Sequence, residues 1–382
     1  MSYLIHKRNI YKALFEEQEL PTHIRKVAFN TTDVSLPNLN RYQDKIGVFN
    51  LYPDYLKLTT PDGYHSSFIY QKPGFAINLK PFDSFEGFVK QLKPNFRKVV
   101  RRSVKRLESC FNISYQMYYG DIDKTTYNLL MERLIDMIEQ RFSQREGRNR
   151  VLEEWDYYHG FAYANILNKK ASLFVIYNEN EPIEISLNFH LGNMMYSSIS
   201  SYDLDYGKFS LGNIEIFMQL EWCFNNDIIL FDMGYGDFDY KRRWSNLTYQ
   251  FKTLIISKKN NFISKTVCFW NLLKFKTINY LIAKKLNNRY NSLLGFLKGK
   301  KETKVETEYT LSPIDELPED VRPIDFKSFE NPSLKKPIYD FLYSNSEFVD
   351  KVKAYSILSD TNSFIIEGSK INSKITFENA SN

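Results

Sequence analysis

The stretch MMYSSISSYDLDYGKFSLGNIEIFMQLEWCFNNDIILFDMGYGDFDYKRRW, residues 194–244, decides the fold. Its first part, residues 194–201, is aromatic, serine-rich and preceded by a Leu-Gly-Asn turn, which predicts a strand inside a sheet. Apolar residues at helical spacing then begin at Leu211, so a long helix is expected there. Residues 228–231 predict a second buried strand, and a short helix is expected to end near Trp244. The order is strand, turn, helix, strand, helix.

The turn before the long helix contains two glycines and a lysine, Gly207, Lys208 and Gly212. The first amides of a helix have no partner within the helix and lie at the positive end of its dipole. Glycines let a ligand approach that backbone closely, so the amides around residues 208–213 suit a phosphate or pyrophosphate. An ordinary glycine turn explains the same letters, because loose glycine patterns are common.

A more specific pattern follows, in the form FDxGxGxxxYKxxW from Phe231 to Trp244. Preceded by a glycine turn and a long helix, it resembles the Gcn5-related N-acetyltransferase (GNAT) superfamily. Within that superfamily it resembles the BioF2-like or CelD-like acyltransferases, which are related to the Fem-type aminoacyl transferases. The resemblance extends over about residues 94–258. It implies an α/β (α+β) fold, in which a GNAT-type mixed sheet is flanked by helices and followed by a C-terminal helical extension. A tandem (double) GNAT-like architecture is an alternative that stays open.

The resemblance also implies a donor and its site. The donor would be acyl-CoA, with no metal, and its thioester would lie against the strand at residues 194–201. The residues implied as donor contacts are Ser198, Ile199, Gly207, Lys208, Leu211, Gly212 and Asn213, with Lys241 as a partner for a phosphate or an acidic acceptor. The sequence departs from the usual Gln/Arg-x-x-Gly-x-Gly/Ala phosphate loop of the family.

Acyl transfer from a thioester needs a deprotonated amine, a polarised carbonyl and a proton for the leaving thiolate. The sequence has no evident Ser-His-Asp or Cys-His signature, so direct attack by the amine is expected, without a covalent enzyme intermediate. Tyr240 is the first candidate acid, because the resemblance places it on the short helix facing the thioester, and Tyr235 is the second. Glu184 and Asp237 are the candidates for the base or the amine-orienting group. The competing interpretation of the two tyrosines is a structural position in the core. The competing interpretation of the two acids is a surface ion pair.

The net charge of +6 is unevenly distributed along the chain. Residues 258–301 contain eleven Lys or Arg and no Asp or Glu, whereas residues 302–382 carry a net charge of −6, which leaves about +1 for residues 1–257. This near-neutral balance argues against a broad surface for duplex nucleic acid. The basic, aromatic pattern of residues 262–301 predicts a helix that lies on an anionic membrane surface; packing against another domain or subunit is the alternative.

These shifts in composition divide the chain into five expected segments. They are a mostly β part at 1–90 that could be a degenerate GNAT-like half, a GNAT-like domain at 91–260, a basic helix at 261–301, an acidic linker at 302–337 and a small C-terminal segment at 338–382. Within the first, a Lys-Pro-Gly turn at residues 72–74 is expected to separate two strands. Residues 95–109 predict an amphipathic helix with a uniformly positive polar face.

The leading functional hypothesis is a cytoplasmic N-acyltransferase whose acceptor is a small amine, such as an amino sugar in surface polysaccharide synthesis. The sequence shows neither a signal peptide nor a membrane span, so the expected location is the cytoplasm, peripheral to the inner face of the membrane if the basic helix binds lipid. Two alternatives stay open. One is Fem-type transfer from aminoacyl-tRNA, favoured by the basic helix at 95–109 and opposed by the charge balance. The other is a membrane-peripheral binding protein that lacks catalysis.

Overall fold

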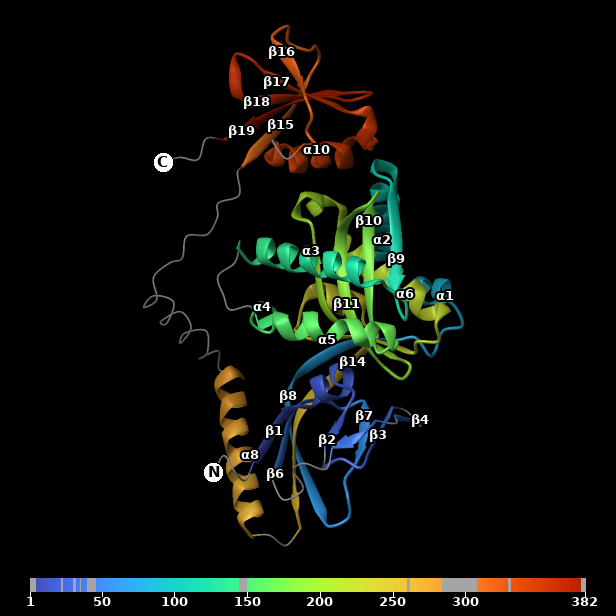
Figure 1. Ribbon diagram of the computed structural model, residues 1–382, viewed down its shortest axis with the longest axis vertical. Helices are drawn as coiled ribbons and strands as arrows, with labels where there is room; N and C mark the ends of the chain where they lie inside the picture. Colours follow the sequence, from blue (N-terminus) through green and yellow to red (C-terminus); the bar gives the residue numbers. More distant parts are fainter. Residues whose placement is uncertain are drawn as a thin grey trace, which may run out of the picture.

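The computed structural model describes residues 5–21, 23–29, 32–34, 36–39, 46–143, 150–259, 262–283, 308–328 and 331–378. A nine-stranded mixed sheet forms its centre (Figure 1). In spatial order its strands are β1 (Ile5–Asn9), β6 (Ile46–Pro53), β14 (Leu247–Lys258), β8 (Tyr64–Asn78), β13 (Leu230–Tyr235), β12 (Met194–Tyr202), β11 (Glu181–Leu191), β10 (Ala171–Asn178) and β9 (Ile113–Tyr118). Neighbouring strands are antiparallel except for two pairs, β1 with β6 and β12 with β13.

Helices cover both faces of this sheet, and the N-terminal part of the chain adds several short strands beside it. The helices are η2 (Lys12–Glu16), α1 (Phe85–Gln91), α2 (Pro94–Cys110), α3 (Lys124–Ser143), α4 (Arg150–Glu153), α5 (Trp155–Leu167), η3 (Leu204–Phe209), α6 (Leu211–Asn225), α7 (Asp239–Trp244) and α8 (Phe262–Ala283). The short strands are β2 (Leu20–Pro21), β3 (Lys26–Phe29), β4 (Thr32–Val34), β5 (Asn38–Leu39) and β7 (Leu56–Thr59). The expectation of a mixed sheet flanked by helices is confirmed.

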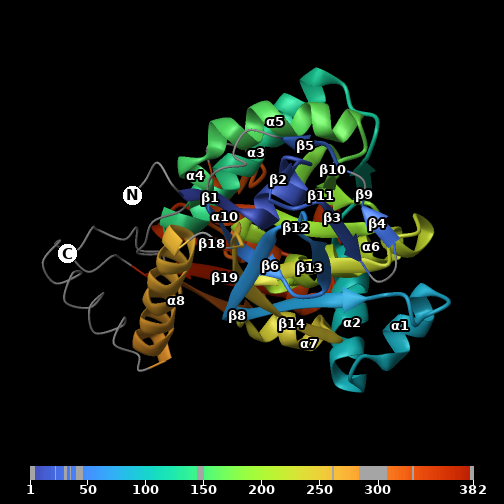
Figure 2. The same cartoon turned by 90° about the horizontal axis from the view of Figure 1, so that it is seen from below.

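Each face of the sheet has its own apolar core. On β11, Leu187 and Phe189 point toward α3 and α5, while on the opposite face α1, α2 and α6 pack against β8 and β13. The end-on view shows α3 and α5 on one side of the strands and α2 and α7 on the other (Figure 2). The elements predicted for residues 194–244 all form, because their apolar spacing matches the face that each one buries.

The expected Lys-Pro-Gly turn is wrong, because β8 runs without a break through residues 72–74. Pro73 pairs with Gln250 and Gly74 pairs with Tyr249 across the β8–β14 ladder. A Cβ on Gly74 would lie 2.3 Å from the Tyr249 ring. The glycine therefore allows an aromatic ring to lie against the backbone, rather than reversing the chain. The same strand pairs with β13 and β14, so residues 1–90 share one sheet with the GNAT-like segment.

The C-terminal part is a separate antiparallel sheet with one long helix. Its strands, in spatial order, are β15 (Tyr309–Ile314), β19 (Asn372–Phe377), β18 (Asp360–Glu367), β17 (Lys353–Ile357) and β16 (Val321–Ile324), and its helices are α10 (Pro332–Asn345) and η4 (Val349–Lys351). Strands β18 and β19 form an antiparallel pair. The linker interpretation of residues 302–337 is wrong over β15, β16 and the start of α10. Both strands are edges of the sheet, where Pro313 and Pro323 are tolerated, so proline did not mark a linker here.

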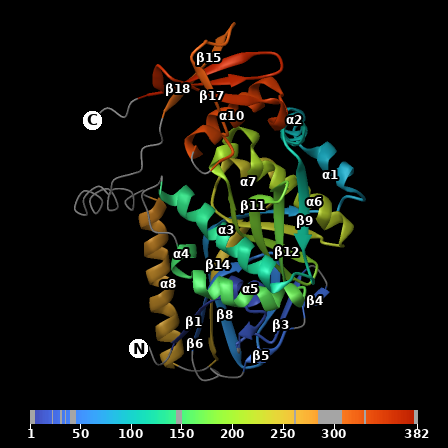
Figure 3. The same cartoon turned by 45° about the horizontal axis from the view of Figure 1, so that its top comes forward.

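This sheet is joined to the larger one through α10, which packs against η3 and the end of α2 (Figure 3). Tyr339 of α10 contacts the rings of Phe111 and Tyr206, and Lys208 of η3 pairs with Asp340 at 3.1 Å. The C-terminal part therefore supports the loop that leads into α6.

The basic segment forms α8 over residues 262–283, and the rest of its predicted length lies outside the described residues. Leu272 and Phe275 pack α8 against Ile46, Val48 and Ile255 of the sheet. Among the helices of the described ranges, none combines the length and the apolar character that a membrane crossing needs.

A candidate active site where two parallel strands separate

The site begins where β12 and β13 stop pairing. The two strands are hydrogen-bonded only from Met194 to Tyr196 on β12 and from Leu230 to Asp232 on β13. Beyond this point β12 continues along β11 to Tyr202, while β13 follows β8. The inner edge of β12 therefore faces an opening instead of a neighbouring strand, and its backbone groups are available to a ligand.

A β-bulge on β12 lies in this opening. Leu187 of β11 pairs with Ile199, and the next residue, Asn188, pairs with Ser197, so Ser198 is the extra residue. A bulge twists the strand locally and re-aims its side chains, which is why bulges are common beside active sites. Ser198 lines the opening, as the sequence predicted, whereas Ile199 is buried in the core on the other face. Ile199 is therefore not placed to contact a donor through its side chain.

Asp232 holds β13 in this position. Its buried carboxylate accepts hydrogen bonds from the hydroxyls of Tyr11 (2.5 Å), Tyr55 (2.6 Å) and Tyr249 (2.8 Å), and from the Gly234 amide (2.7 Å). Burial raises the pKa of Asp232, and these donors oppose the rise. Four donors match an ionised carboxylate, so the cluster satisfies a charge that would be costly if it were buried alone.

Lys241 fastens the end of β13 from the other side. Its ammonium donates to the carbonyls of Met233 and Tyr235, at 2.6 Å each. Burial lowers the pKa of Lys241 to about 8. The side chain lines the opening, but its donors are directed at the strand. These contacts give Lys241 a structural role between α7 and β13, and its pairing with a phosphate or an acidic acceptor stays a prediction.

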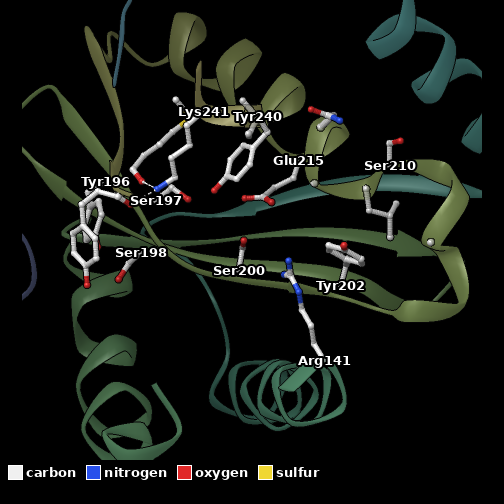
Figure 4. A pocket seen from close by; sticks show the side chains of 18 residues that line it. Arg141, Tyr196, Ser197, Ser198, Ser200, Tyr202, Ser210, Glu215, Tyr240 and Lys241 are labelled. Atoms are coloured by element: carbon white, nitrogen blue, oxygen red, sulfur yellow. Dashed lines mark hydrogen bonds between the residues drawn. The ribbon is translucent and has the colours of Figure 1, made fainter. Parts of the chain in front are cut away.

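A cavity of about 570 Å³ lies between the separated strands, α3, α6 and α7 (Figure 4). It is lined by Arg141, Tyr196, Ser197, Ser198, Ser200, Tyr202, Gly207, Ser210, Leu211, Gly212, Asn213, Glu215, Ile216, Met233, Gly234, Tyr235, Tyr240 and Lys241. Most of the predicted site residues lie in it, from both the glycine turn and the FDxGxGxxxYKxxW segment. The described side chains include no group of three or more His, Cys, Asp or Glu placed to hold a metal ion.

The N-terminus of α6 opens into this cavity. Ser210 precedes the helix in the left-handed conformation, and its carbonyl accepts from the amides of Asn213 and Ile214. Leu211 and Gly212 supply the first two amides of the helix, which point away from its hydrogen-bonded turns. A Cβ on Gly212 would meet nothing closer than a Tyr202 ring carbon at 4.0 Å, so the space in front of this turn is open. The carboxamide of Asn213 instead accepts from Trp244 of α7 at 3.1 Å.

Tyr240 and Glu215 approach each other across the cavity. The Tyr240 side chain reaches down from α7 with its hydroxyl toward the Glu215 carboxyl of α6 (Figure 4). Tyr240 is 42% exposed, and its partial burial together with the charge of Glu215 raises its pKa to about 12, so the phenol stays protonated at neutral pH. Burial raises the pKa of Glu215 to about 7, and bonds from Ser186, Gln219 and Ser200 oppose that rise. The cavity thus contains a neutral acid beside a carboxyl group that titrates near neutrality.

Three other predicted residues lie outside the cavity. Glu184 is fully buried on β11, beneath Ser186. Asp237 is exposed and pairs with Arg242, and Lys208 pairs with Asp340 of the C-terminal part. Neither Glu184 nor Asp237 touches the space that a substrate would occupy, so neither is placed to act as a base, and the Lys208 ammonium is already engaged by a carboxylate.

Sequence reasoning missed Glu215 and Arg141. Glu215 lies in the apolar run LGNIEIFMQL, where a single carboxylate on the buried face of a helix was the available signal. Arg141, in the last turn of α3, reaches toward Ser200 and Glu215, and its guanidinium lies 4.9 Å from the Tyr202 ring centroid (Figure 4). Its sequence neighbours gave no sign of the cavity.

Comparisons with known proteins give one family match and several similar solved structures. Residues 94–242 match the family model described as Acetyltransferase (GNAT) domain. Similar solved structures include a conserved protein of unknown function from Bacteroides thetaiotaomicron VPI-5482 (9% identity, 56% of this chain and 71% of that chain, TM-score 0.39). FemX (10% identity, 54% of this chain and 68% of that chain, TM-score 0.38) and a tandem GNAT protein from the clavulanic acid biosynthesis pathway (8%, 58% and 67%, TM-score 0.30) are two further similar structures.

Identity and TM-score are low in all three cases, so no function is transferred from these structures. No curated protein matches the chain. Residues 94–242 are thus similar to a GNAT acetyltransferase domain.

Proposed function

We propose that the protein is an N-acyltransferase that moves an acyl group from acyl-CoA to a small amine. One observation carries the proposal: the opened edge of β12, the first amides of α6 and the Tyr240–Glu215 pair all face a single cavity. The proposal extends to the BioF2-like or CelD-like branch, through the FDxGxGxxxYKxxW residues that form β13 and α7.

The donor half of the cavity fits a thioester with a phosphorylated tail. The amides of Leu211 and Gly212 would hold the pyrophosphate, because free amides at the positive end of a helix favour anions. The open space in front of Gly212 is the part that a side chain would fill. The free edge of β12 at Ser197 and Ser198 offers backbone groups to the extended, amide-containing arm of the donor.

The other half of the cavity holds the acid and the base. Glu215 removes a proton from the acceptor ammonium, and the free amine attacks the thioester carbonyl carbon. A C–N bond forms, the C–S bond breaks, and Tyr240 donates its proton to the leaving thiolate. The resulting phenolate takes up the proton that the nitrogen loses as the amide forms. Glu215 thereby replaces Glu184 and Asp237 as the proposed base, and Tyr240 keeps the role that the sequence suggested.

Transfer from acyl-CoA to a small amine suits this geometry better than transfer from aminoacyl-tRNA. Among small amines, we choose an amino sugar as the acceptor. The positive face of α2 is partly occupied: Arg97 donates to the Lys90 carbonyl, Arg101 pairs with Glu86, and Arg106 contacts Ser346. A platform for nucleic acid would leave such groups to phosphates. The Tyr240–Glu215 pair argues equally against a binding protein without catalysis.

The donor assignment predicts a specific effect of Gly212→Val. Its side chain would project into the cavity in front of the first α6 amides, so the Kd for coenzyme A should rise about tenfold or more, equivalent to about 1.4 kcal/mol. Titration calorimetry with coenzyme A measures this. Gly160→Val, on the exposed side of α5, is the matched control, since a Cβ there meets nothing within 4 Å. Unchanged affinity in a folded Gly212→Val protein would exclude the loop as the pyrophosphate site.

The acid assignment predicts that Tyr240→Phe lowers turnover by about 10²-fold or more, the usual scale for losing a general acid, with little change in KM. Release of free thiol from acetyl-CoA, in the presence of an amine found by screening, measures turnover. Tyr235→Phe is the matched control, because this ring also lines the cavity but lies over the Lys72 ammonium. Wild-type turnover in Tyr240→Phe, with a loss in Tyr235→Phe, would assign the acid to Tyr235.

The base assignment predicts the pH profile. A base works only when it is deprotonated, and the pKa of Glu215 is raised to about 7. Consequently kcat/KM should be highest above this pH and should fall about tenfold per pH unit below it. Glu215→Gln should lose about 10²-fold in kcat/KM at pH 8 and should lack this acidic limb. An unchanged limb in the variant would show that another group titrates.

A further inference from the structure

A polar stripe lies beneath the cavity in an otherwise apolar interior. Glu184, Ser186, Asn188 and His190 alternate along β11, so all four point to the face covered by α6, and all four are buried. Polar groups are seldom placed in a core without partners or a function, since each one left unpaired costs free energy. Ser186 links the stripe to the cavity, because its hydroxyl contacts Glu215, which lines the cavity.

The contacts of Ser186 with Glu184 and Glu215 require that one of the two carboxyl groups is protonated. The Ser186 hydroxyl oxygen lies 2.5 Å from Oε1 of Glu215 and 2.8 Å from Oε1 of Glu184. A serine hydroxyl has one hydrogen to donate, so it can satisfy only one of the two carboxylates. The other contact is a hydrogen bond only if that carboxyl group carries a proton and donates it to the serine oxygen.

The surroundings decide which carboxyl group holds the proton. Glu184 is fully buried, and in the described part of the chain its Oε2 atom has no hydrogen-bond partner. Glu215 also accepts from the Gln219 carboxamide at 3.0 Å. The polar and charged groups that face the pair are Ser186 on β11, Gln219 on α6, Ser200 on β12, Arg141 on α3 and Tyr240 on α7. The donors and the positive charge are therefore on the side of Glu215.

We propose that Glu184 is held in its neutral, protonated form and donates to Ser186, which in turn donates to the Glu215 carboxylate. The pair then carries one negative charge, and this charge lies at the cavity wall. Glu184 is a positioning residue that acts through Ser186: it keeps the serine hydrogen directed at Glu215. Two ionised carboxylates so close together would repel each other, so the arrangement depends on one of them staying neutral.

The significance of this relay for acyl transfer rests on the proposed function, but the proton itself is measurable without any substrate. Infrared spectroscopy of the free protein at pH 8.5 should show the carbonyl stretch of one buried carboxylic acid. Glu184→Gln should lose that band, and Glu215→Gln should keep it. Lowering the pH through about 7 should add acid bands in the wild type from Glu215 and from Glu16, because burial raises the pKa of each to about 7. Glu215→Gln should gain only the Glu16 band.

Three results would overturn this relay: no acid band in the wild-type protein at pH 8.5, a band that survives in Glu184→Gln, or a band lost in Glu215→Gln instead. The pH series on the wild type needs no variant, so a folding defect in either substitution leaves the proposal open to refutation. Ser186→Ala gives an independent reading. Without the hydroxyl bridge the Glu215 band should appear at a higher pH, because Glu215 loses a donor to its charged form.

A second inference concerns α8, whose outer side is apolar and aromatic. Phe262 is 82% exposed, and Phe269, Trp270 and Tyr280 are more than half exposed. Residues 262, 269, 273 and 280 follow one another at spacings of seven, four and seven. This spacing places them on one side of the helix. That side lies away from Phe275, which packs on the sheet. An exposed aromatic stripe of this kind marks a surface that contacts another phase or molecule.

Lysines flank this stripe. Lys265 and Lys276 follow one side of it and Lys274 the other, all exposed, and residues 258–301 contain no acid. We infer that the outer side of α8 lies on an anionic lipid surface, with the aromatic rings at the headgroup level and the ammonium groups near lipid phosphates. A second copy of this helix is a poor partner, because their pairing would bring lysines together without a compensating carboxylate.

Vesicle sedimentation tests this docking with the full-length protein. Vesicles containing phosphatidylglycerol should bind it, and phosphatidylcholine vesicles should bind it far more weakly. Reversing Lys265, Lys274 and Lys276 to Glu should reduce binding by about 100-fold or more, from about 1 kcal/mol for each lysine. Lys98→Glu, Arg102→Glu and Lys105→Glu together, on the exposed face of α2, are the matched charge control. Equal binding to both lipids, loss of binding in the α2 control only, or a dimer that dissociates in the α8 variant would refute the assignment.

Discussion

A buried carboxylate that accepts three tyrosine hydroxyls is the interaction on which the site depends. Asp232 lies at the last paired position between β12 and β13, and its partners come from three different parts of the chain. Tyr11 adjoins η2, Tyr55 lies between β6 and β7, and Tyr249 belongs to β14. The N-terminal segment therefore does more than extend the sheet: it supplies two of the three hydroxyls that bind Asp232, at the point where β13 and β12 stop pairing. A charge buried in this way is tolerable only while its donors stay in place.

The remaining walls of the cavity are tied to this point by a few polar contacts. Lys241 binds the carbonyls of β13, and Trp244, one turn further on α7, donates to Asn213 at the start of α6. The loop before α6 is supported in turn by α10, through Tyr339 and the Lys208–Asp340 pair. The C-terminal sheet is thus linked physically to the turn that would hold the donor's phosphates, which gives this part of the chain a positioning role.

The local elements could be predicted well, because each strand or helix buries one face, and the spacing of the apolar residues on that face can be read from the sequence. The strand β12, the start of α6 at Leu211 and the short helix at Tyr240 follow from such patterns. What sequence reasoning missed depends on distant partners. Gly74 looked like a turn because nothing nearby shows that Tyr249 lies against it, and the edge strands with Pro313 and Pro323 looked like a linker.

The same limit applies to the chemistry. Tyr240 could be proposed because a motif marks it, whereas Glu215 faces the cavity only because α6 crosses β11 at Ser186. Glu184 was chosen for its position on a strand beside the opening, and the direction of its side chain, under α6 instead of into the cavity, is a property of the packed sheet. Charge placement in a site is a tertiary feature, and its pKa shifts arise from burial that the sequence does not display.

The central claim is that the Asp232 cluster holds open the strands between which the donor binds. The most direct test is the Kd for coenzyme A of Asp232→Asn, measured by calorimetry at a temperature where the variant is folded, beside Asp237→Asn on the exposed loop. The amide keeps the shape of Asp232 but not the charge that three tyrosines share, so affinity should fall by about tenfold or more. Asp237→Asn should bind as the wild type does. A folded Asp232→Asn protein with wild-type affinity would contradict the account.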